Sequence, residues 1–280
     1  MELNFGGISE AKEPDFLVLP IPYSYTSSYG PSVREGPERI LLASRNLEAY
    51  DEESLFPLED LKIKTFPFLE PTAAGPEAMI ERIETHVAKI YEPNQFLISI
   101  GGDHTVAIGV VRGLLRFYDR ISILVLDGHD DLRDEYESSP ISHACVTRRL
   151  SELGPVVIIG VRSISTLPQD RPDNVAVLTA RELIEGTDFK KIIDKLDDPV
   201  YISCDLDVFD PALMPAVGSP EPDGLSWPEV TRIIRYVIKS KKVIGADFVE
   251  LAPIPGIISP DFITARLIMK TMVYQKTGYA

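Results

Sequence analysis

The sequence predicts an α/β fold in which one mostly parallel sheet carries helices on both faces, giving a three-layer α/β/α arrangement. Short runs of Ile, Leu and Val alternate with longer stretches that have helical apolar spacing, from one end of the chain to the other. No repeat or low-complexity linker interrupts this alternation. The 280 residues, 44% of them hydrophobic, are enough for a full core, and length alone allows one domain or two. Because no boundary interrupts the alternation, we expect a single domain over residues 1–280.

Several apolar runs are predicted to be strands, because each is short, rich in branched side chains and bounded by charged residues, Gly or Pro. They cover residues 16–20, 95–100, 121–126, 156–159, 175–178, 200–205 and 242–247. Runs that are apolar without alternation are typical of parallel strands covered on both faces. Parallel strands need crossover connections, which the stretches between these runs are long enough to supply.

Helices are predicted where apolar residues recur three and four positions apart. These stretches are residues 37–47, 76–91, 104–117, 142–153, 182–196 with a break at Gly186, 227–240 and 259–277. In the last helix, Ser259 is expected at the N-cap and Pro260 at the first helical position. Residues 21–36 form a polar loop rich in Tyr, Ser, Gly and Pro, and residues 59–72 are expected to be irregular.

Composition disfavours several classes of protein. The net charge of −15 and the pI near 4.7 disfavour nucleic acid as a partner, whereas an acidic surface would attract a small cation. No apolar run is long enough for a membrane span, and the N-terminus lacks the basic and apolar regions of a signal peptide. Cys145 and Cys204 are too few for a disulfide framework or a zinc cage, which fits a reducing cytoplasm. Each cysteine is expected to be a small buried side chain.

Charged residues directly follow the apolar run at 121–126. The sequence continues DGHDD, which places Asp127, His129 and Asp131 two positions apart. In an extended chain, alternate side chains point the same way, so these three groups would converge on one side. Sites in parallel sheets lie just beyond the carboxyl ends of the strands. Two carboxylates and an imidazole gathered there would destabilise the fold unless a cation lay between them.

Two further predicted strands end in groups that can bind a metal ion. After residues 95–100 the chain continues GGDH, where the glycines permit a sharp turn and His104 begins the next predicted helix. At 201–210, YISCDLDVFD, alternation places Asp205 and Asp207 on one side and the apolar residues on the other. Paired carboxylates after a buried strand are hard to explain as surface charge.

The candidate ligands therefore come from three strand ends, and they are His104, Asp127, His129, Asp131, Asp205 and Asp207. Their carboxylates would balance about four positive charges, or about two divalent ions. Oxygen and imidazole ligands without thiolate favour Mn²⁺ over Fe²⁺, Co²⁺ and Zn²⁺. A site with two ions typically generates hydroxide near neutral pH and holds the atoms of a displacement. The residues predict a metal-activated hydrolase.

These strings resemble the motifs of the ureohydrolase family of arginases and agmatinases. GGDH at 101–104 matches a family motif, and DGHDD at 127–131 resembles D-A-H-x-D. Residues 204–211 and 218–224 resemble the signature D-x-D-x-x-D-P…G-T-P-E-P-G-G. The resemblance covers nearly the whole chain. It implies a fold of the arginase–deacetylase type with a mostly parallel central sheet, and a pair of Mn²⁺ ions in each subunit.

The resemblance also implies how the ligands are shared between the ions. One ion would be held by His104, Asp127, Asp131 and Asp205, and the other by Asp127, His129, Asp205 and Asp207. Asp127 and Asp205 would therefore bridge. A hydroxide between the ions, also oriented by Asp131, would attack the guanidinium carbon of the substrate, and the intermediate would collapse to urea and an amine.

Two further positions gain roles from the resemblance. Glu250 matches the acid that pairs with the substrate guanidinium, although by itself it would be taken for a capping or surface carboxylate. His143 matches the histidine that passes a proton to the departing amine, and an unperturbed imidazole titrates near neutrality. Departures from the family pattern spare the ligands: Gly128 replaces an alanine, Ser219 a threonine and Asp223 a glycine. Gly128 is expected to be harmless because it faces away from the ligands.

The substrate prediction depends on two loops. Residues 23–36 and 132–142 resemble the agmatinase branch, and the second loop lacks the Asn- and Ser-rich run by which arginases hold an amino acid. The resemblance therefore predicts hydrolysis of agmatine to putrescine and urea, a reaction of polyamine biosynthesis. Asp134, Glu135 and Asp223 are candidates to attract the distant amine of this cationic guanidino substrate.

Alternatives stay open within and outside this reaction class. N1-aminopropylagmatine is the nearest alternative substrate, followed by arginine and guanidinobutyrate, and Arg133 would suit an acidic guanidino compound if it points inward. A catalytically silent, metal-stabilised oligomer and a deacetylase with one zinc site are the alternatives of other classes. The resemblance also implies a homo-oligomer, either a trimer or a hexamer.

Overall fold

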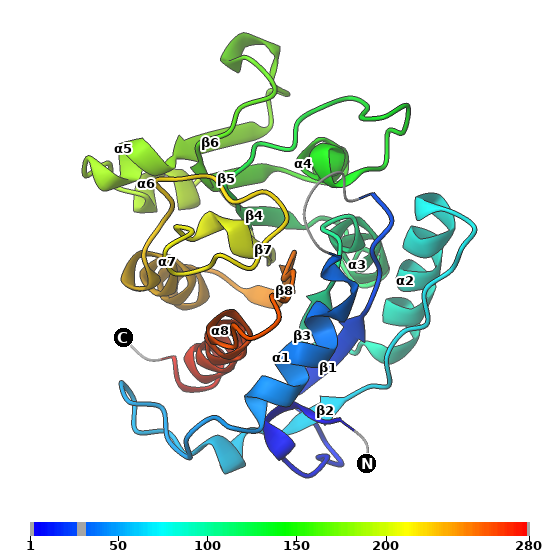
Figure 1. Ribbon diagram of the computed structural model, residues 1–280, viewed down its shortest axis with the longest axis vertical. Helices are drawn as coiled ribbons and strands as arrows, with labels where there is room; N and C mark the ends of the chain where they lie inside the picture. Colours follow the sequence, from blue (N-terminus) through cyan, green and yellow to red (C-terminus); the bar gives the residue numbers. More distant parts are fainter. Residues whose placement is uncertain (1–2, 27–31, 279–280) are drawn as a thin grey trace.

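One sheet of parallel strands forms the centre of the computed structural model (Figure 1). Within the residues that the structure describes, 3–26 and 32–278, the sheet has eight strands in the order β2-β1-β3-β8-β7-β4-β5-β6. The strands are β1 (Phe16–Ile21), β2 (Ile63–Thr65), β3 (Phe96–Gly101), β4 (Ser122–Leu126), β5 (Val156–Val161), β6 (Val175–Thr179), β7 (Val200–Asp205) and β8 (Val243–Val249). All of the pairings between them are parallel, as the predicted fold class requires.

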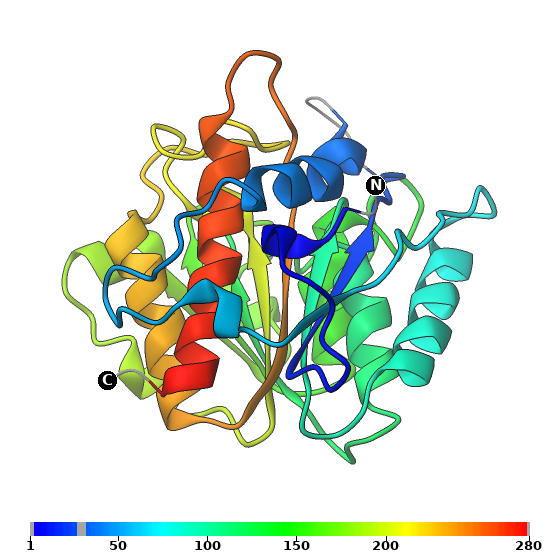
Figure 2. The ribbon, with the colours of Figure 1, turned by 90° about the horizontal axis from the view of Figure 1, so that it is seen from below.

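Helices cover both faces of the sheet, so the molecule has three layers (Figure 2). The helices are α1 (Gly36–Ser44), α2 (Pro76–Ile90), α3 (Val106–Leu114), α4 (Val146–Ser151), α5 (Ala180–Ile184), α6 (Lys190–Ile193), α7 (Trp227–Ser240) and α8 (Ser259–Thr277). Along β1, Phe16 and Val18 join the core under α1, α7 and α8, whereas Leu17 and Leu19 join the core under α2, α3 and α4. Because both sets are buried, the strand is apolar throughout and not alternating.

Most predicted elements are confirmed, and the differences have local causes. Residues 59–72, expected to be irregular, contain β2, an edge strand of only three residues that is too short to produce a sequence pattern. The predicted helix at 142–153 begins with a 3₁₀ turn at His143–Cys145 before α4. Gly186, with φ of 97°, separates α5 from α6 as expected. Ser259 is the first residue of α8, not its N-cap, and Ile258 stands at the cap position without a side-chain hydrogen bond.

The register of the central strands brings their carboxyl ends together. Leu126 of β4 lies opposite Cys204 of β7, so the residues that follow them, Asp127 and Asp205, leave the sheet side by side. On the other side of β7, Asp205 lies opposite Val249 of β8. β3 pairs with β8 on the side of β8 that is opposite β7. Four neighbouring strands therefore end at one place, which is where parallel sheets hold their sites.

Two smaller expectations can be compared with the structure. Cys145 and Cys204 are both free and fully buried, which confirms that they pack as small apolar side chains. Among the described helices, none combines the length and the apolar character needed to cross a membrane.

A buried lysine of the last helix forms ion pairs with the segment after α1. Lys270 of α8 is 1% exposed, and its Nζ lies 2.7 Å from Asp51 Oδ1 and 2.7 Å from Glu52 Oε1. Asp51 is fully buried and also accepts from the backbone N–H of Ser54. A charge pair of this kind is costly to break, because removing one partner leaves the other buried without compensation.

Lys270→Met is therefore expected to lower the free energy of unfolding by about 3 kcal/mol, because it leaves the carboxylate of Asp51 buried without a cationic partner. Urea unfolding followed by circular dichroism measures this. The double variant Lys270→Met/Asp51→Asn serves as control and should recover part of the loss. An unchanged unfolding midpoint for the single variant would show that the pair does not stabilise the fold.

Candidate active site

The turn after β3 places His104 against the other strand ends. A Cβ on Gly102 would lie 2.1 Å from the carbonyl oxygen of Tyr23, so only glycine allows the chain to pass at this point. His104 is fully buried, and its backbone N–H donates to Glu250 Oε1 at 2.7 Å. Glu250 follows β8 directly, and its own N–H donates to the carbonyl oxygen of Gly102. These bonds join the ends of β3 and β8.

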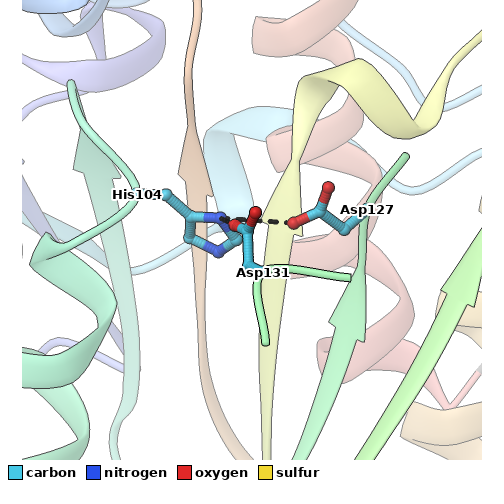
Figure 3. Close-up of side chains that lie close together, drawn as sticks. All are labelled: His104, Asp127 and Asp131. Carbon is cyan, nitrogen blue, oxygen red and sulfur yellow. Dashed lines mark ion pairs between the residues drawn. The ribbon is translucent and has the colours of Figure 1, made fainter. Parts of the chain in front are cut away.

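Three carboxylates surround one ring nitrogen of His104. Its Nδ1 lies 3.3 Å from Asp127 Oδ2, 3.5 Å from Asp131 Oδ2 and 3.3 Å from Asp205 Oδ2. Figure 3 shows the side chain of His104, from the turn after β3, and those of Asp127 and Asp131, from the segment after β4, pointing toward one another. Asp127 is fully buried and Asp205 nearly so. Three carboxylate oxygens thus lie within 3.5 Å of one ring nitrogen.

A second group lies beside the first and shares Asp127 with it. His129 Nδ1 is 2.7 Å from Asp207 Oδ2 and 3.8 Å from Asp127 Oδ1. Ligand atoms of Asp127, His129 and Asp207 all lie within 4.8 Å of one another, as do those of His104, Asp127 and Asp131. Asp205 belongs to neither of these groups, but its Oδ2 lies 3.3 Å from His104 Nδ1, so all six residues that the sequence singled out lie near one another.

Two atoms at the centre of this cluster are buried without a hydrogen-bond partner among the described residues. They are Nδ1 of His104 and Oδ2 of Asp127. The other ring nitrogen of His104, Nε2, lies 3.0 Å from Ser203 Oγ, and that hydroxyl donates to Asp247 Oδ1 at 2.8 Å. Because the single hydroxyl proton goes to Asp247, Ser203 must accept from Nε2–H, which leaves the lone pair of His104 on Nδ1. Buried lone pairs that converge in this way fit a metal ion.

The charges of the cluster also favour a cation. Burial and the charges of Asp207 and Asp131 raise the pKa of Asp127 well above its usual range. Burial and the charges of Asp207 and Asp127 do the same to the pKa of Asp205. Burial alone would lower the pKa of His129, but its hydrogen bond to Asp207 and the nearby carboxylates raise it to about 11. Carboxylates held so close together take up protons unless a metal cation neutralises their charge.

The convergence is as predicted, but the expected reason for it is wrong. β4 ends at Leu126, so Asp127, His129 and Asp131 are not alternate residues of an extended strand. Asp131 has a φ of 45°, and this left-handed turn directs its carboxylate back toward His104. Asp207 likewise lies in a 3₁₀ turn at Leu206–Val208, beyond the end of β7. Turns set by tertiary contacts, and not the period of a strand, orient these ligands.

His143 and Glu250 both line a cavity of about 200 Å³ that also reaches Asp131 and His129. Glu250 has a φ of 67°, a strained value that directs its side chain into the cavity edge. Burial and the charges of Asp205 and Asp103 raise the pKa of Glu250 well above its usual range. A cationic group in the cavity would therefore find a carboxylate that gains stability by pairing with it.

The candidate substrate residues lie in different surroundings. Arg133 lines the cavity, and its guanidinium lies 5.6 Å from the centre of the Tyr136 ring. Asp134 is exposed and pairs with Arg148. Within the described residues, the cavity lining does not include Asp134, Glu135 or Asp223. Their proposed roles stay predictions. Asp223 has a φ of 61°, a conformation that glycine adopts easily, which accounts for the glycine in the family pattern.

Sequence reasoning missed part of the cavity wall. Ser163, Ile164 and Ser165 line the cavity, and Ser165 donates to the buried carboxylate of Asp130. These residues follow β5, which is the neighbour of β4 in the sheet. Their position at the end of a predicted strand was the available signal. That strand end carries no run of charged residues to mark it as part of a site.

Gly128 packs against an arginine that holds the Asp207 turn. Arg162 Nη2 donates to the carbonyl oxygens of Asp207 at 2.6 Å and Glu221 at 2.8 Å, and Nε donates to that of Pro222 at 2.9 Å. A Cβ on Gly128 would lie 2.7 Å from Arg162 Nη1 and 3.1 Å from the Asp207 carbonyl oxygen. The residue indeed faces away from the ligand carboxylates, but the space beside it is filled.

Gly128→Ala is therefore expected to destabilise this chain by about 1–3 kcal/mol, because Arg162 would have to leave its carbonyl partners. Thermal unfolding of the metal-free chain measures the loss. Titration with Mn²⁺ should also show weaker binding, since Gly128 donates its N–H to Asp207 Oδ1. Equal melting temperatures and equal affinities would mean that Arg162 moves aside without cost.

Comparison with known proteins identifies the family of the chain. The model of the Arginase family matches residues 14–274. The chain belongs to the arginase family. An N(1)-aminopropylagmatine ureohydrolase of Synechocystis sp. is 40% identical over 97% of this chain and 92% of its own length. An agmatinase of Pyrococcus horikoshii is 34% identical over 87% of this chain and 86% of its own.

Solved structures of the arginase family agree with the fold. The crystal structure of agmatine ureohydrolase of Thermoplasma volcanium has a TM-score of 0.88 and 29% sequence identity, and the match covers 98% of this chain and 94% of that chain. As an arginase-family ureohydrolase, the chain is a hydrolase that acts on C–N bonds of amidines.

Proposed function

We propose that this ureohydrolase hydrolyses a polycationic guanidino compound, N1-aminopropylagmatine first and agmatine second. The observation that carries the proposal is the half-buried carboxylate of Glu250, which lines a cavity shared with the ligand cluster around His104. A guanidinium ion is planar and positively charged, and it matches a carboxylate through paired hydrogen bonds. Binding there would place the guanidinium carbon beside the cluster.

The residues fit a pair of Mn²⁺ ions, held as the family motifs imply. His104, Asp127, Asp131 and Asp205 would hold one ion, and Asp127, His129, Asp205 and Asp207 the other. When bound, such ions lower the pKa of water so that hydroxide is available near neutral pH. The orphaned lone pairs of His104 and Asp127 and the absence of thiolate from this set support an oxygen-preferring divalent metal.

The remaining residues would orient the substrate and move protons. Asp131 lines the cavity next to His104 and would orient the attacking water by accepting one of its hydrogens. The oxygen adds to the guanidinium carbon, and the bond from that carbon to the alkylated nitrogen then breaks. The electron pair leaves with this nitrogen, which takes a proton from His143 and departs as an amine. Urea is the other product.

Similarity favours the longer substrate over agmatine, which reverses the order expected from the two loops. The relative at 40% identity carries the name N(1)-aminopropylagmatine ureohydrolase, and the agmatinase is 34% identical. The net charge of −15 suits both substrates, because each carries at least one amine in addition to the guanidinium. Arg133 at the cavity wall disfavours a second cation close to Tyr136, so the amines should extend away from it.

The substrate proposal predicts the ranking of rates in a urea-release assay with Mn²⁺. We expect kcat/KM for N1-aminopropylagmatine to exceed that for agmatine by about tenfold, and both to exceed arginine and guanidinobutyrate by about a hundredfold or more, which corresponds to ~2.7 kcal/mol. Arginine is expected to turn over poorly, although Arg133 lines the cavity, because residues 132–142 lack the Asn- and Ser-rich run by which arginases hold an amino acid. Equal turnover of arginine would overturn the substrate class and leave the reaction class intact.

We further propose that the enzyme acts in the cytoplasm as a homo-oligomer, either a trimer or a hexamer, with Mn²⁺ as its native metal. Light scattering of the purified chain measures the oligomer. Metal analysis of protein produced without added metals measures the ion and its stoichiometry. About one Zn²⁺ per chain would favour the single-metal alternative instead.

A further inference from the structure

The loop after β1 reaches the active site through the hydroxyl of Thr26. The backbone N–H of Thr26 donates to Asp103 Oδ2 at 2.9 Å, and its Oγ1 donates to the same oxygen at 2.6 Å. Asp103 is fully buried, and its other oxygen accepts from the N–H and the hydroxyl of Thr105 at 2.9 and 2.8 Å. The carboxylate thus has four donors and holds Thr26 in one orientation.

The same hydroxyl faces His143. Thr26 Oγ1 accepts from the backbone N–H of His143 at 2.9 Å and lies 3.3 Å from its ring nitrogen Nδ1. A hydroxyl has one proton, and here that proton points to Asp103. Toward His143, Thr26 can therefore only accept. Ser142 Oγ lies 3.3 Å from the same nitrogen and is able to accept as well.

We propose that Thr26 is a positioning residue that keeps the proton of neutral His143 on Nδ1 and leaves the lone pair on Nε2. The inference rests on the proposed function, in which His143 supplies a proton to the departing amine. His143 lines the cavity, while its Nδ1 is turned to Thr26 and Ser142, so Nε2 is the nitrogen left for exchange with the substrate. The ring of Tyr136 meets the imidazole edge-on at 5.5 Å between centres and limits its rotation.

In this arrangement, Nδ1 of His143 contacts Thr26, and Nε2 is the nitrogen that exchanges protons with the substrate. In the neutral form Nε2 can take a proton from the cavity, and in the imidazolium form the same atom can donate it to the leaving nitrogen. With the opposite tautomer, the lone pair would face Thr26 and no proton could be taken up at Nε2. Asp103 contributes by accepting the hydroxyl proton, so the tautomer depends on a buried carboxylate that is not part of the cavity lining.

Nitrogen NMR tests the tautomer directly. The chain has 4 histidines, so the ring nitrogens of a ¹⁵N-labelled sample can be assigned by comparison with His143→Gln. The spectrum is recorded on the metal-free chain, because Mn²⁺ is paramagnetic. At a pH where His143 is neutral, we expect a protonated Nδ1 and an unprotonated Nε2 in the unmodified chain. A protonated Nε2 there would overturn the proposal.

Two variants of Thr26 test the consequence for turnover. Thr26→Val keeps the shape and removes the hydroxyl, and it is expected to lower kcat by about 10- to 100-fold with a smaller change in KM. Thr26→Ser keeps the hydroxyl and should retain kcat within about threefold, with the tautomer of the unmodified chain. Mn²⁺ content should be the same in all three proteins, because Thr26 contacts none of the six candidate ligands.

The outcomes separate the possibilities. Full kcat in Thr26→Val, or equal losses in Thr26→Val and Thr26→Ser, would overturn the positioning role, because only Thr26→Val removes the hydroxyl to which that role is assigned. If Thr26→Val fails to fold, the spectrum of the unmodified chain and the activity of Thr26→Ser still decide. If the unmodified chain releases no urea from any guanidino compound, the proposed function fails, while the NMR result continues to report on the tautomer.

Discussion

Replacing Asp127 by Asn is expected to abolish urea release and to remove metal from the protein. Asp127 is fully buried, belongs to both groups of potential ligands, and has an oxygen without a hydrogen-bond partner among the described residues. An amide keeps the shape but loses the charge that balances a divalent cation. We expect kcat/KM to fall by about 10³-fold or more, which corresponds to ~4 kcal/mol, and bound Mn²⁺ to fall from about two to about one or fewer per chain. Metal analysis after gel filtration measures the second effect.

Asp134→Asn is the matched control for Asp127→Asn. It makes the same chemical change in the same loop, but Asp134 is exposed and pairs with Arg148. Its metal content should equal that of the unmodified chain. If Asp127→Asn kept a full complement of Mn²⁺ and its activity, the assignment of Asp127 as a shared ligand would be wrong.

Replacing Glu250 by Gln is expected to damage turnover by about 10²- to 10³-fold and to leave the metal content unchanged. The carboxylate lines the cavity and is fixed by the backbone N–H of His104, but it does not belong to either group of potential ligands. Gln keeps the hydrogen bond from His104 and loses the charge that pairs with the guanidinium. Steady-state kinetics with N1-aminopropylagmatine and agmatine measure the loss, and KM should rise because ground-state binding also weakens.

Glu135→Gln offers a control in which an exposed carboxylate outside the cavity lining is neutralised. It should change kcat/KM by less than about threefold, as a surface charge that attracts the substrate from a distance would. The assigned role of Glu250 would be refuted by full activity of Glu250→Gln. Loss of metal from that variant would instead place Glu250 among the ligands.

The cluster of candidate metal ligands shows how much of a site a sequence can reveal. Each ligand-bearing strand is an uninterrupted apolar run that stops at a carboxylate or at a glycine turn before a histidine. Because parallel strands end at one edge, residues that are far apart in the chain, such as His104, Asp127 and Asp205, can be assigned to one place from the sequence alone. The register of β3, β8, β7 and β4 and the distances from His104 to the two carboxylates confirm that they lie close together.

The apolar patterns in the sequence do not predict the conformations of the turns that carry the ligands. The turn at Asp131 and the 3₁₀ turn that carries Asp207 have no periodic signature, because their conformations depend on contacts with residues distant in sequence. The contact between Gly128 and Arg162 is of the same kind, since it joins the ends of β4 and β5. β2 was missed because a three-residue edge strand obtains its hydrogen bonds from β1 and has no pattern of its own.

By itself, the sequence determined the α/β class, the order of most helices and strands, and the set of groups that gather at the strand ends. These follow from hydrophobic periodicity and from the topology of parallel sheets, which are local or nearly local properties. Only the tertiary structure decided which atoms of those groups face one another. It places Nδ1 of His104 toward three carboxylates and Nδ1 of His143 toward Thr26, through contacts between segments distant in the chain, whose directions no spacing along the sequence encodes.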